Sequence, residues 1–290
     1  MKSPFYLLAA SVLLLTGTAC VRTSTVVKVD KEGAGSVIAR YHFSPEMLAM
    51  VDQLGALGGI QGAAPQGPNL AMIGEMAKPD EESLAADASN YGEGVRYAKH
   101  ELGKDDDGWE GYTVVYEFDD IRQVRIDQNS VPGKAKEFVE SSGEKLDAEE
   151  GSRITFDLKD DTLEIHTNIA GAGVNQMIDE EQLAQARNMG MKPSEALKMA
   201  AGMTRGMRVG FFVRIDGEIA ETNAEHVSGN LIILSDADVS QVMQDPDFAE
   251  FIDQTVENPE AVTEEAVKEL YDDLEAMTIE MSEKVTVKFK

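Results

Sequence analysis

The sequence RVGFFVRIDGEIAETNAEHVSGNLIIL, residues 208–234, carries the strongest indication of fold class. Apolar and polar side chains alternate over 208–215, which is typical of a half-buried strand. Asp216 and Gly217 then form a strong hairpin signal into a second strand at 218–224. Ser228, Gly229 and Asn230 turn the chain into a third strand at 231–234. The stretch therefore predicts an antiparallel meander of three strands.

Strand and helix patterns alternate irregularly on both sides of this meander. Further strands are expected in a hairpin at 25–43 that turns at 32–35, at 113–118, in a pair at 154–158 and 163–165, and at 284–290. Helices are expected after Pro45, over 179–206 with a break near 190–193, through Val239, Val242, Phe248 and Ile252, and from an Asn258 cap through Pro259 to Met277. Hairpins mixed with separate helices predict an α+β fold with a largely antiparallel sheet of hairpins and a meander, and with packed helices.

The first nineteen residues have the layout of a secretory signal. One charge, Lys2, precedes an apolar run at 5–15, and small residues follow at 16–19. A helix that spans a bilayer needs roughly 20 residues, and this run is about half that length. The sequence therefore predicts a cleaved signal peptide at 1–19 rather than a retained transmembrane helix.

The chain's single cysteine, Cys20, follows this segment directly, after the small residues Thr18 and Ala19. The arrangement resembles the lipobox of bacterial lipoproteins, although Gly17 stands where Leu is usual. The resemblance implies that a diacylglyceryl group is attached to the Cys20 thiol before the signal is cleaved. In such lipoproteins an Asp after the cysteine signals inner-membrane retention in Gram-negative cells, so Val21 implies the outer membrane. The alternative is an ordinary signal peptide that ends near a free cysteine.

The remaining chain is expected to form one domain behind a short tether. Residues 20–24 are assigned to the tether and 25–290 to a single α+β domain. Within it, the Gly-, Ala- and Pro-rich segment 55–69 is predicted to be a mobile loop, and the charged segment 134–151 a surface insertion. Five extended residues reach at most about 20 Å, so we expect the folded body to lie close to the membrane.

The charge balance excludes one class of partner. The chain has 26 Lys and Arg against 53 Asp and Glu, a formal net charge of −27, and removal of the segment that holds Lys2 makes it one unit more negative. Such a body repels phosphate backbones, so no nucleic-acid partner is expected. The acidic excess is typical of a solvated surface, and an acidic face that binds cations is the alternative.

The sequence offers no catalytic or metal motif. There is no G-x-S-x-G elbow, and the lone cysteine is assigned to the anchor. His42, His100, His166 and His226 are widely spread, and none has a second histidine at the i+4 spacing of a helical zinc site. The run Asp105-Asp106-Asp107-Gly108 lacks the alternating acids of a calcium loop and is predicted to be a turn. We therefore expect no catalytic residue, no metal and no cofactor.

One candidate binding site is a row of methionines. Met199, Met203 and Met207 are spaced by four, which places them on one stripe of the predicted helix. Thioethers bind soft copper ions or line adaptable apolar grooves. The alternative is that the three side chains fill the core.

Two segments are similar to the corresponding parts of a diffuse group of bacterial envelope lipoproteins. The first runs from Val26-Val27-Lys28-Val29 through Gly33-Ala34-Gly35 to Val37-Ile38, and the second covers 206–236 with its Asp216-Gly217 turn. By its layout the chain distantly resembles the mycobacterial LppM lipoprotein family. The resemblance implies an exported domain that contacts lipids, and it brings no catalytic motif.

Together these observations favour a membrane-anchored cell-envelope lipoprotein that acts as a non-enzymatic binding or assembly module. Its partners would be the membrane, through the lipid on Cys20, and an envelope protein or apolar ligand. One alternative is a carrier or sensor of an apolar ligand such as a lipid, which predicts a cavity beside the methionines. The other is a hydrolase, which predicts two carboxylates in one cleft.

Overall fold

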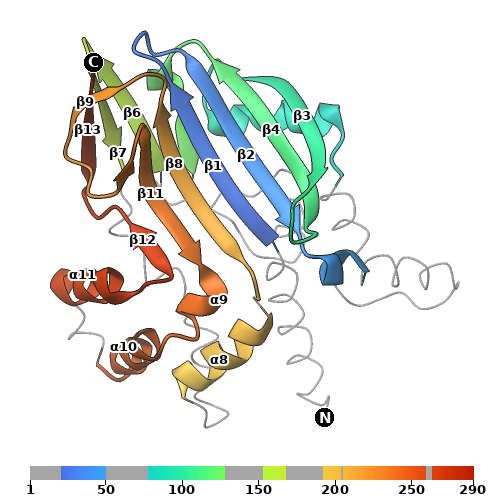
Figure 1. Cartoon of the computed structure of the whole chain (residues 1–290), viewed down its shortest axis with the longest axis vertical. Helices are drawn as coiled ribbons and strands as arrows, with labels where there is room; N and C mark the ends of the chain where they lie inside the picture. Colours follow the sequence, from blue (N-terminus) through green and yellow to red (C-terminus); the bar gives the residue numbers. More distant parts are fainter. Residues whose placement is uncertain (1–20, 50–77, 128–152, 168–191, 204, 259–262) are drawn as a thin grey trace, which may run out of the picture.

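Two β-sheets packed against each other form the body of the protein (Figure 1). The computed structural model describes residues 21–49, 78–127, 153–167, 192–203, 205–258 and 263–290. The predicted α+β class is confirmed, because the sheets are mostly antiparallel and several short helices accompany them.

The larger sheet has eight strands in the order β10-β11-β8-β1-β2-β4-β3, and β12 pairs with β11 beyond this path. Every pair is antiparallel except β1 with β8, which is parallel. The strands are β1 (Val21–Val29), β2 (Gly35–Phe43), β3 (Arg96–Lys104), β4 (Glu110–Phe118), β8 (Arg208–Ile215), β10 (Val227–Ser228), β11 (Leu231–Asp238) and β12 (Met277–Ile279).

The smaller sheet has five strands in the order β5-β6-β7-β13-β9, and all of its pairs are antiparallel. Its strands are β5 (Arg125–Asp127), β6 (Arg153–Lys159), β7 (Thr162–His166), β9 (Ile219–Thr222) and β13 (Lys284–Phe289). The hairpins predicted at 25–43 and at 154–165 and the strand predicted at 284–290 are thereby confirmed.

One apolar core joins the two sheets. Each contributes the alternate residues that face inward, such as Val37 and Ala39 from β2, Ile165 from β7, and Val285 and Val287 from β13, all of which are fully buried. Burial of each such side chain contributes about 1.5–3 kcal/mol. The alternation in the sequence gives each sheet one apolar face, and burial of these two faces holds the sheets together. The core also includes the phenol rings of Tyr41, Tyr112 and Tyr116 on the larger sheet and of Tyr91 just before β3, and burial raises the pKa of these groups.

The pairing expected within 208–234 is wrong. Strand β8 has β1 on one side and β11 on the other, so neither of its edges is free for β9. At the end of β8, the Asp216 N–H donates to the carbonyl of Val29 at 2.8 Å, and Gly217 has a φ of 140°. The chain then crosses into the smaller sheet, where β9 pairs with β13, before β11 returns to pair with β8. The Asp216-Gly217 signal therefore marks a crossover between sheets instead of a tight hairpin.

Helices gather at one end of the larger sheet (Figure 1). These are α8 (Pro193–Met203), α9 (Val239–Val242), α10 (Pro246–Glu257) and α11 (Glu264–Asp273), whereas α4 (Glu81–Asp87), η1 (Ala88–Tyr91) and η2 (Ile121–Gln123) lie between strands elsewhere; the turn that Pro45 opens is helical at 45–49. Phe248 and Ile252 of α10 pack with Leu270 and Leu274 in a second apolar cluster.

The helix boundaries differ from the predicted ones because of local capping. The segment 239–257 is two helices instead of one, since the Asp245 carboxylate accepts the N–H groups of Asp247 and Phe248 and starts α10 anew. Asn258 ends α10 instead of starting the next helix, and Thr263 caps α11. Met277, expected on that helix, lies in β12.

Several predicted features of domain organisation lie outside the described residues. They are the signal peptide at 1–19, Cys20, the loop at 55–69 and the insertion at 134–151. Residues 21–24, expected as part of a tether, instead form the beginning of β1. None of the helices that the structure describes is both long and apolar enough to cross a membrane.

Candidate functional site

The candidate site is the end of the larger sheet at which β1 begins. Val21 is already paired with Phe43 of β2, and Arg22 is paired with His42 of β2 and with Arg208 of β8. Strand β1 lies inside the sheet, between β8 and β2, so its first residues are held on both sides. The rigid sheet therefore begins at Val21.

Arg22 fixes this end of the strand through four contacts. Its guanidinium donates to the Asp105 carboxylate at 2.9 Å, to the Asp107 carboxylate at 2.8 Å and to the carbonyl of Gly206 at 3.1 Å. The guanidinium carbon also lies 4.2 Å from the centre of the buried Trp109 ring. An arginine held by two carboxylates and an aromatic face is more strongly fixed than a surface ion pair, because its planar fork matches several partners at once.

The turn between β3 and β4 supplies both carboxylates. Asp105 accepts the Trp109 N–H at 2.8 Å on one oxygen and binds Arg22 with the other. The predicted turn at 105–108 is confirmed, with Gly108 in the left-handed region at φ 87°. Asp105 and Asp107 therefore bind Arg22, and these ion pairs hold the turn beside β1.

The chain after α8 closes the other side of Arg22. Gly206 has a φ of 80°, and a Cβ at this position would lie 2.9 Å from the Trp109 ring, so only glycine fits. Its N–H donates to the Ser240 hydroxyl, which in turn donates to Asp238, the residue that caps α9. Contacts thus run from β1 through Gly206 to the helical end of the molecule.

His42 lies beside Arg22 across the β1–β2 pair. Its pKa is lowered, chiefly because partial burial disfavours the charged ring, and Arg40 and Arg22 lower it further while Asp105 opposes them. The imidazole therefore stays neutral at neutral pH and adds no positive charge to this end of the sheet.

Loss of the Arg22 contacts should destabilise the fold. The Arg22→Met variant keeps the apolar stem over Trp109 and removes the charged hydrogen bonds, at an expected cost of about 1–2 kcal/mol because the group is only partly exposed. The matched control is Arg96→Met, since Arg96 binds Asp119 through two bonds on an exposed surface. Urea unfolding should show a much smaller loss for the control, because solvent screens an exposed ion pair. Equal losses in the two variants would contradict a special role for Arg22.

The methionine stripe is not formed as predicted. Helix α8 ends at Met203, so Met207 lies beyond it, after Gly206 and next to β8. The backbones of Met199 and Met203 belong to α8, while their side chains lie outside the described residues. The premise of one helical row is therefore wrong, and binding of a ligand by these three methionines stays a prediction.

The described histidines have separate surroundings. His100 on β3 contacts the Tyr97 hydroxyl at 2.8 Å, whereas His166 on β7 lies beside Asp157 and Glu164. The latter group was missed because its members are brought together across a hairpin, not at helical spacing. The signal that could have found it is the Asp160-Asp161 turn, which places 157 opposite 164.

Comparison with known proteins yields one distant likeness. No protein-family model matches the chain, and no curated protein matches it. Among solved structures, it resembles the NMR structure of the folded domain of LppM from Mycobacterium tuberculosis, with 10% sequence identity, a TM-score of 0.27, and coverage of 74% of this chain and 80% of that one. At this TM-score the likeness carries no functional argument, so the function must be argued from the residues themselves.

Proposed function

We propose that the protein is a lipoprotein of the cell envelope, anchored through lipid on Cys20, that acts as a non-enzymatic binding or assembly module at the membrane. The observation that carries the proposal is the start of β1 at Val21, directly after the lipobox-like segment. Since no spacer separates Cys20 from β1, a lipid on Cys20 would hold the folded domain itself against the bilayer.

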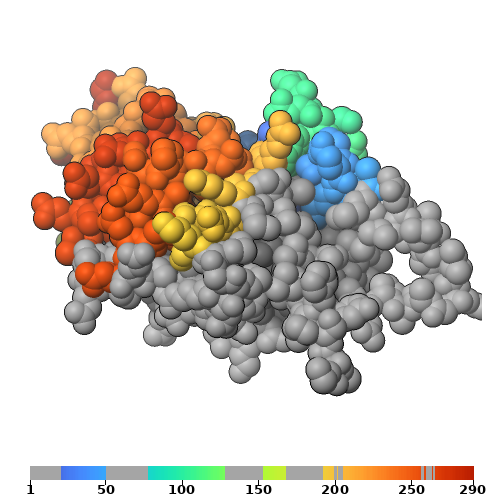
Figure 2. Space-filling model, turned by 90° about the horizontal axis from the view of Figure 1, so that it is seen from below, coloured from blue at the N-terminus to red at the C-terminus, as the bar shows by residue number. Residues whose placement is uncertain are grey.

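The position of Val21 sets the distance and the orientation. One extended residue spans at most about 3.6 Å, so the lipidated thiol would lie within a few ångströms of a paired strand. Since β1 is held on both sides and Arg22 is fixed, the helical end of the molecule would face the membrane. Figure 2 views the molecule from this end, with α8 in yellow and the helices that follow in orange and red.

The anchor itself accounts for stable attachment. Each buried methylene contributes about 0.8 kcal/mol, and permanent anchoring needs two acyl chains or more, which a diacylglyceryl group provides. The residue after Cys20 is Val21 and not the Asp that signals inner-membrane retention, which supports the outer membrane as the destination.

A binding role fits the described carboxylates better than hydrolysis does. Glu280 is fully buried, but its two oxygens accept the backbone N–H groups of Glu225 and Ser282, which is a structural role. Asp157 and Glu164 do approach each other, on an outer strand surface and not in a cleft.

The orientation can be tested with a photo-crosslinking residue at two exposed positions. Val209 lies at the anchored end, beside Thr23 in the sheet, and Lys290 lies at the opposite end, where Figure 1 marks the C-terminus. In cells, crosslinking at Val209 should give several-fold more lipid adduct than crosslinking at Lys290.

A spacer variant is the control for this experiment. Ten Gly and Ser residues inserted between Cys20 and Val21 add about 17 Å of flexible chain, which should remove the difference between the two positions. Equal lipid adducts at both positions in the protein without the spacer would contradict the proposed orientation.

A further inference from the structure

The hairpin of β6 and β7 places three metal-binding side chains on one surface. In its register Asp157 faces Glu164 directly, and His166 follows two residues later on the same side of β7. The intervening residues Phe156 and Ile165 point into the core, so the alternation of the strands sends Asp157, Glu164 and His166 outward together. We refer to these three residues as the hairpin cluster.

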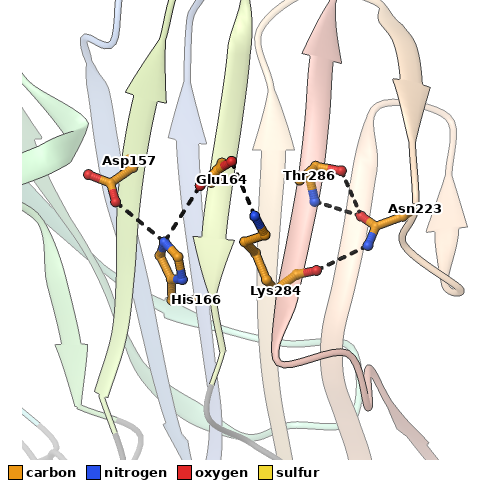
Figure 3. A network of polar contacts seen from close by, with 6 residues as sticks. All are labelled: Asp157, Glu164, His166, Asn223, Lys284 and Thr286. Atoms are coloured by element: carbon orange, nitrogen blue, oxygen red, sulfur yellow. Dashed lines mark hydrogen bonds and ion pairs between the residues drawn. The ribbon is translucent and has the colours of Figure 1, made fainter.

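The donor atoms of the hairpin cluster converge (Figure 3). The Nε2 atom of His166 lies 3.3 Å from Oδ2 of Asp157 and 4.0 Å from Oε2 of Glu164, and the three donor atoms all lie within 4.8 Å of one another. Ligands bound to Zn²⁺ at about 2.0–2.1 Å in a tetrahedral arrangement are separated by about 3.4 Å. His166 and Asp157 already have that spacing, at 3.3 Å, and a small rotation of the Glu164 side chain would bring its oxygen, now 4.0 Å from His166, into the same set.

Neighbouring strand β13 orients the cluster. Lys284 donates to Oε1 of Glu164 at 3.3 Å, which leaves Oε2 directed at His166. Asn223, just after β9, binds the backbone of β13 at two points. Its side chain accepts the N–H of Thr286 at 2.6 Å and donates to the carbonyl of Lys284 at 3.0 Å. These bonds fix the backbone that carries Lys284, and the hydrogen bond from Lys284 to Glu164 resembles the outer hydrogen bonds that orient ligating carboxylates in metal sites.

Charge and ligand type indicate which ion fits. Two carboxylates beside an imidazole attract a divalent cation, and Lys284 offsets part of the negative charge. Imidazole suits zinc and related transition metals, whereas calcium and magnesium prefer oxygen ligands throughout. The side chains of His166 and Glu164 are about one third exposed and that of Asp157 about two thirds, so water or a partner group can reach the ion.

We propose that Asp157, Glu164 and His166 form a binding site for a divalent transition-metal ion of the zinc type, with coordination positions open to solvent. The site lies on the outer surface of the smaller sheet. It is independent of the anchor on Cys20, and an open coordination position there can accept a ligand from a second molecule.

The test is Zn²⁺ binding to the full mature protein, purified from membranes in detergent and freed of metal by dialysis against a chelator. A chromophoric chelator in competition measures the affinity. Wild type should bind one Zn²⁺ specifically, and His166→Ala should weaken that binding by at least about 10-fold, as should Asp157→Asn. The matched control is His100→Ala, because His100 contacts Tyr97 on the other sheet and its loss should leave the affinity unchanged.

Histidine-ring NMR on wild-type protein gives a second measurement, in which the His166→Ala variant serves only to assign the signals. Stoichiometric Zn²⁺ should shift the ring signals of one histidine, and those signals should be the ones missing in His166→Ala. The proposal is overturned if Zn²⁺ shifts a different ring, or if wild type and His166→Ala bind Zn²⁺ with the same affinity.

Discussion

Truncation after Met281 is expected to unfold the protein. The deleted residues include β13, which lies inside the smaller sheet between β7 and β9. They also include Val285, Val287 and Phe289, which are buried in the core shared by both sheets. These three side chains contribute about 1.5–3 kcal/mol each, and a whole domain is stable by only about 5–15 kcal/mol. Loss of the strand also leaves β7 and β9 with unpaired backbone groups.

Circular dichroism during heating measures the effect, and a point variant keeps the test quantitative. The truncated chain should show no cooperative transition. Val287→Ala should retain one while losing about 2–3 kcal/mol, since it leaves a cavity in the core. Lys288→Ala is the matched control on the exposed side of the same strand and should lie within about 0.5 kcal/mol of wild type. A truncated chain that melts like wild type would show that β13 is peripheral.

The Cys20→Ser variant is expected to lose all lipid. Cys20 is the chain's only cysteine, so no other thiol can accept a diacylglyceryl group. Labelling of cells with a fatty-acid analogue should mark wild type and fall to background in the variant, and the signal should remain uncleaved by the lipoprotein peptidase. The control is a double variant, Cys20→Ser with Ser24→Cys, which moves the thiol into β1 and should stay unlabelled. Label of equal intensity on wild type and Cys20→Ser would contradict the anchor.

Strand positions were predictable because burial of one sheet face leaves a period of two in the sequence. The alternation at 208–215, 113–118 and 284–290 located β8, most of β4 and β13. Strand β3 left no such trace, since it lies at the edge of the sheet and most of its side chains are exposed. Its sequence therefore has no apolar periodicity to detect.

Strand pairing was less predictable than strand position, because it depends on which edges are free. The Asp216-Gly217 pair is typical of a hairpin, but β1 and β11 occupy both edges of β8, and β9 joins the other sheet. The same limit applies to the candidate site. Arg22 meets Asp105 and Gly206 across 83 and 184 residues, and no local pattern in the sequence reports such contacts.

Helix ends were the least predictable part of the fold. Composition favoured helix over 179–206 with a break near 190–193, and the methionine spacing placed Met207 on the same stripe. The helix ends at Met203 instead, and Gly206 adopts a positive φ where the Trp109 ring excludes any side chain. A tertiary contact thus sets the conformation beyond the helix, and it removes Met207 from the predicted row. Capping by Asp245 and Thr263 is local and could have been recognised from the sequence.

Mass spectrometry of the N-terminal peptide of protein purified from membranes tests the central claim most directly. Trypsin cleaves after Arg22, so a mature chain that starts at the anchor yields the peptide Cys20-Val21-Arg22. The proposal predicts this tripeptide with a diacylglyceryl group on the thiol. A first residue other than Cys20, or Cys20 with a free thiol, would contradict it.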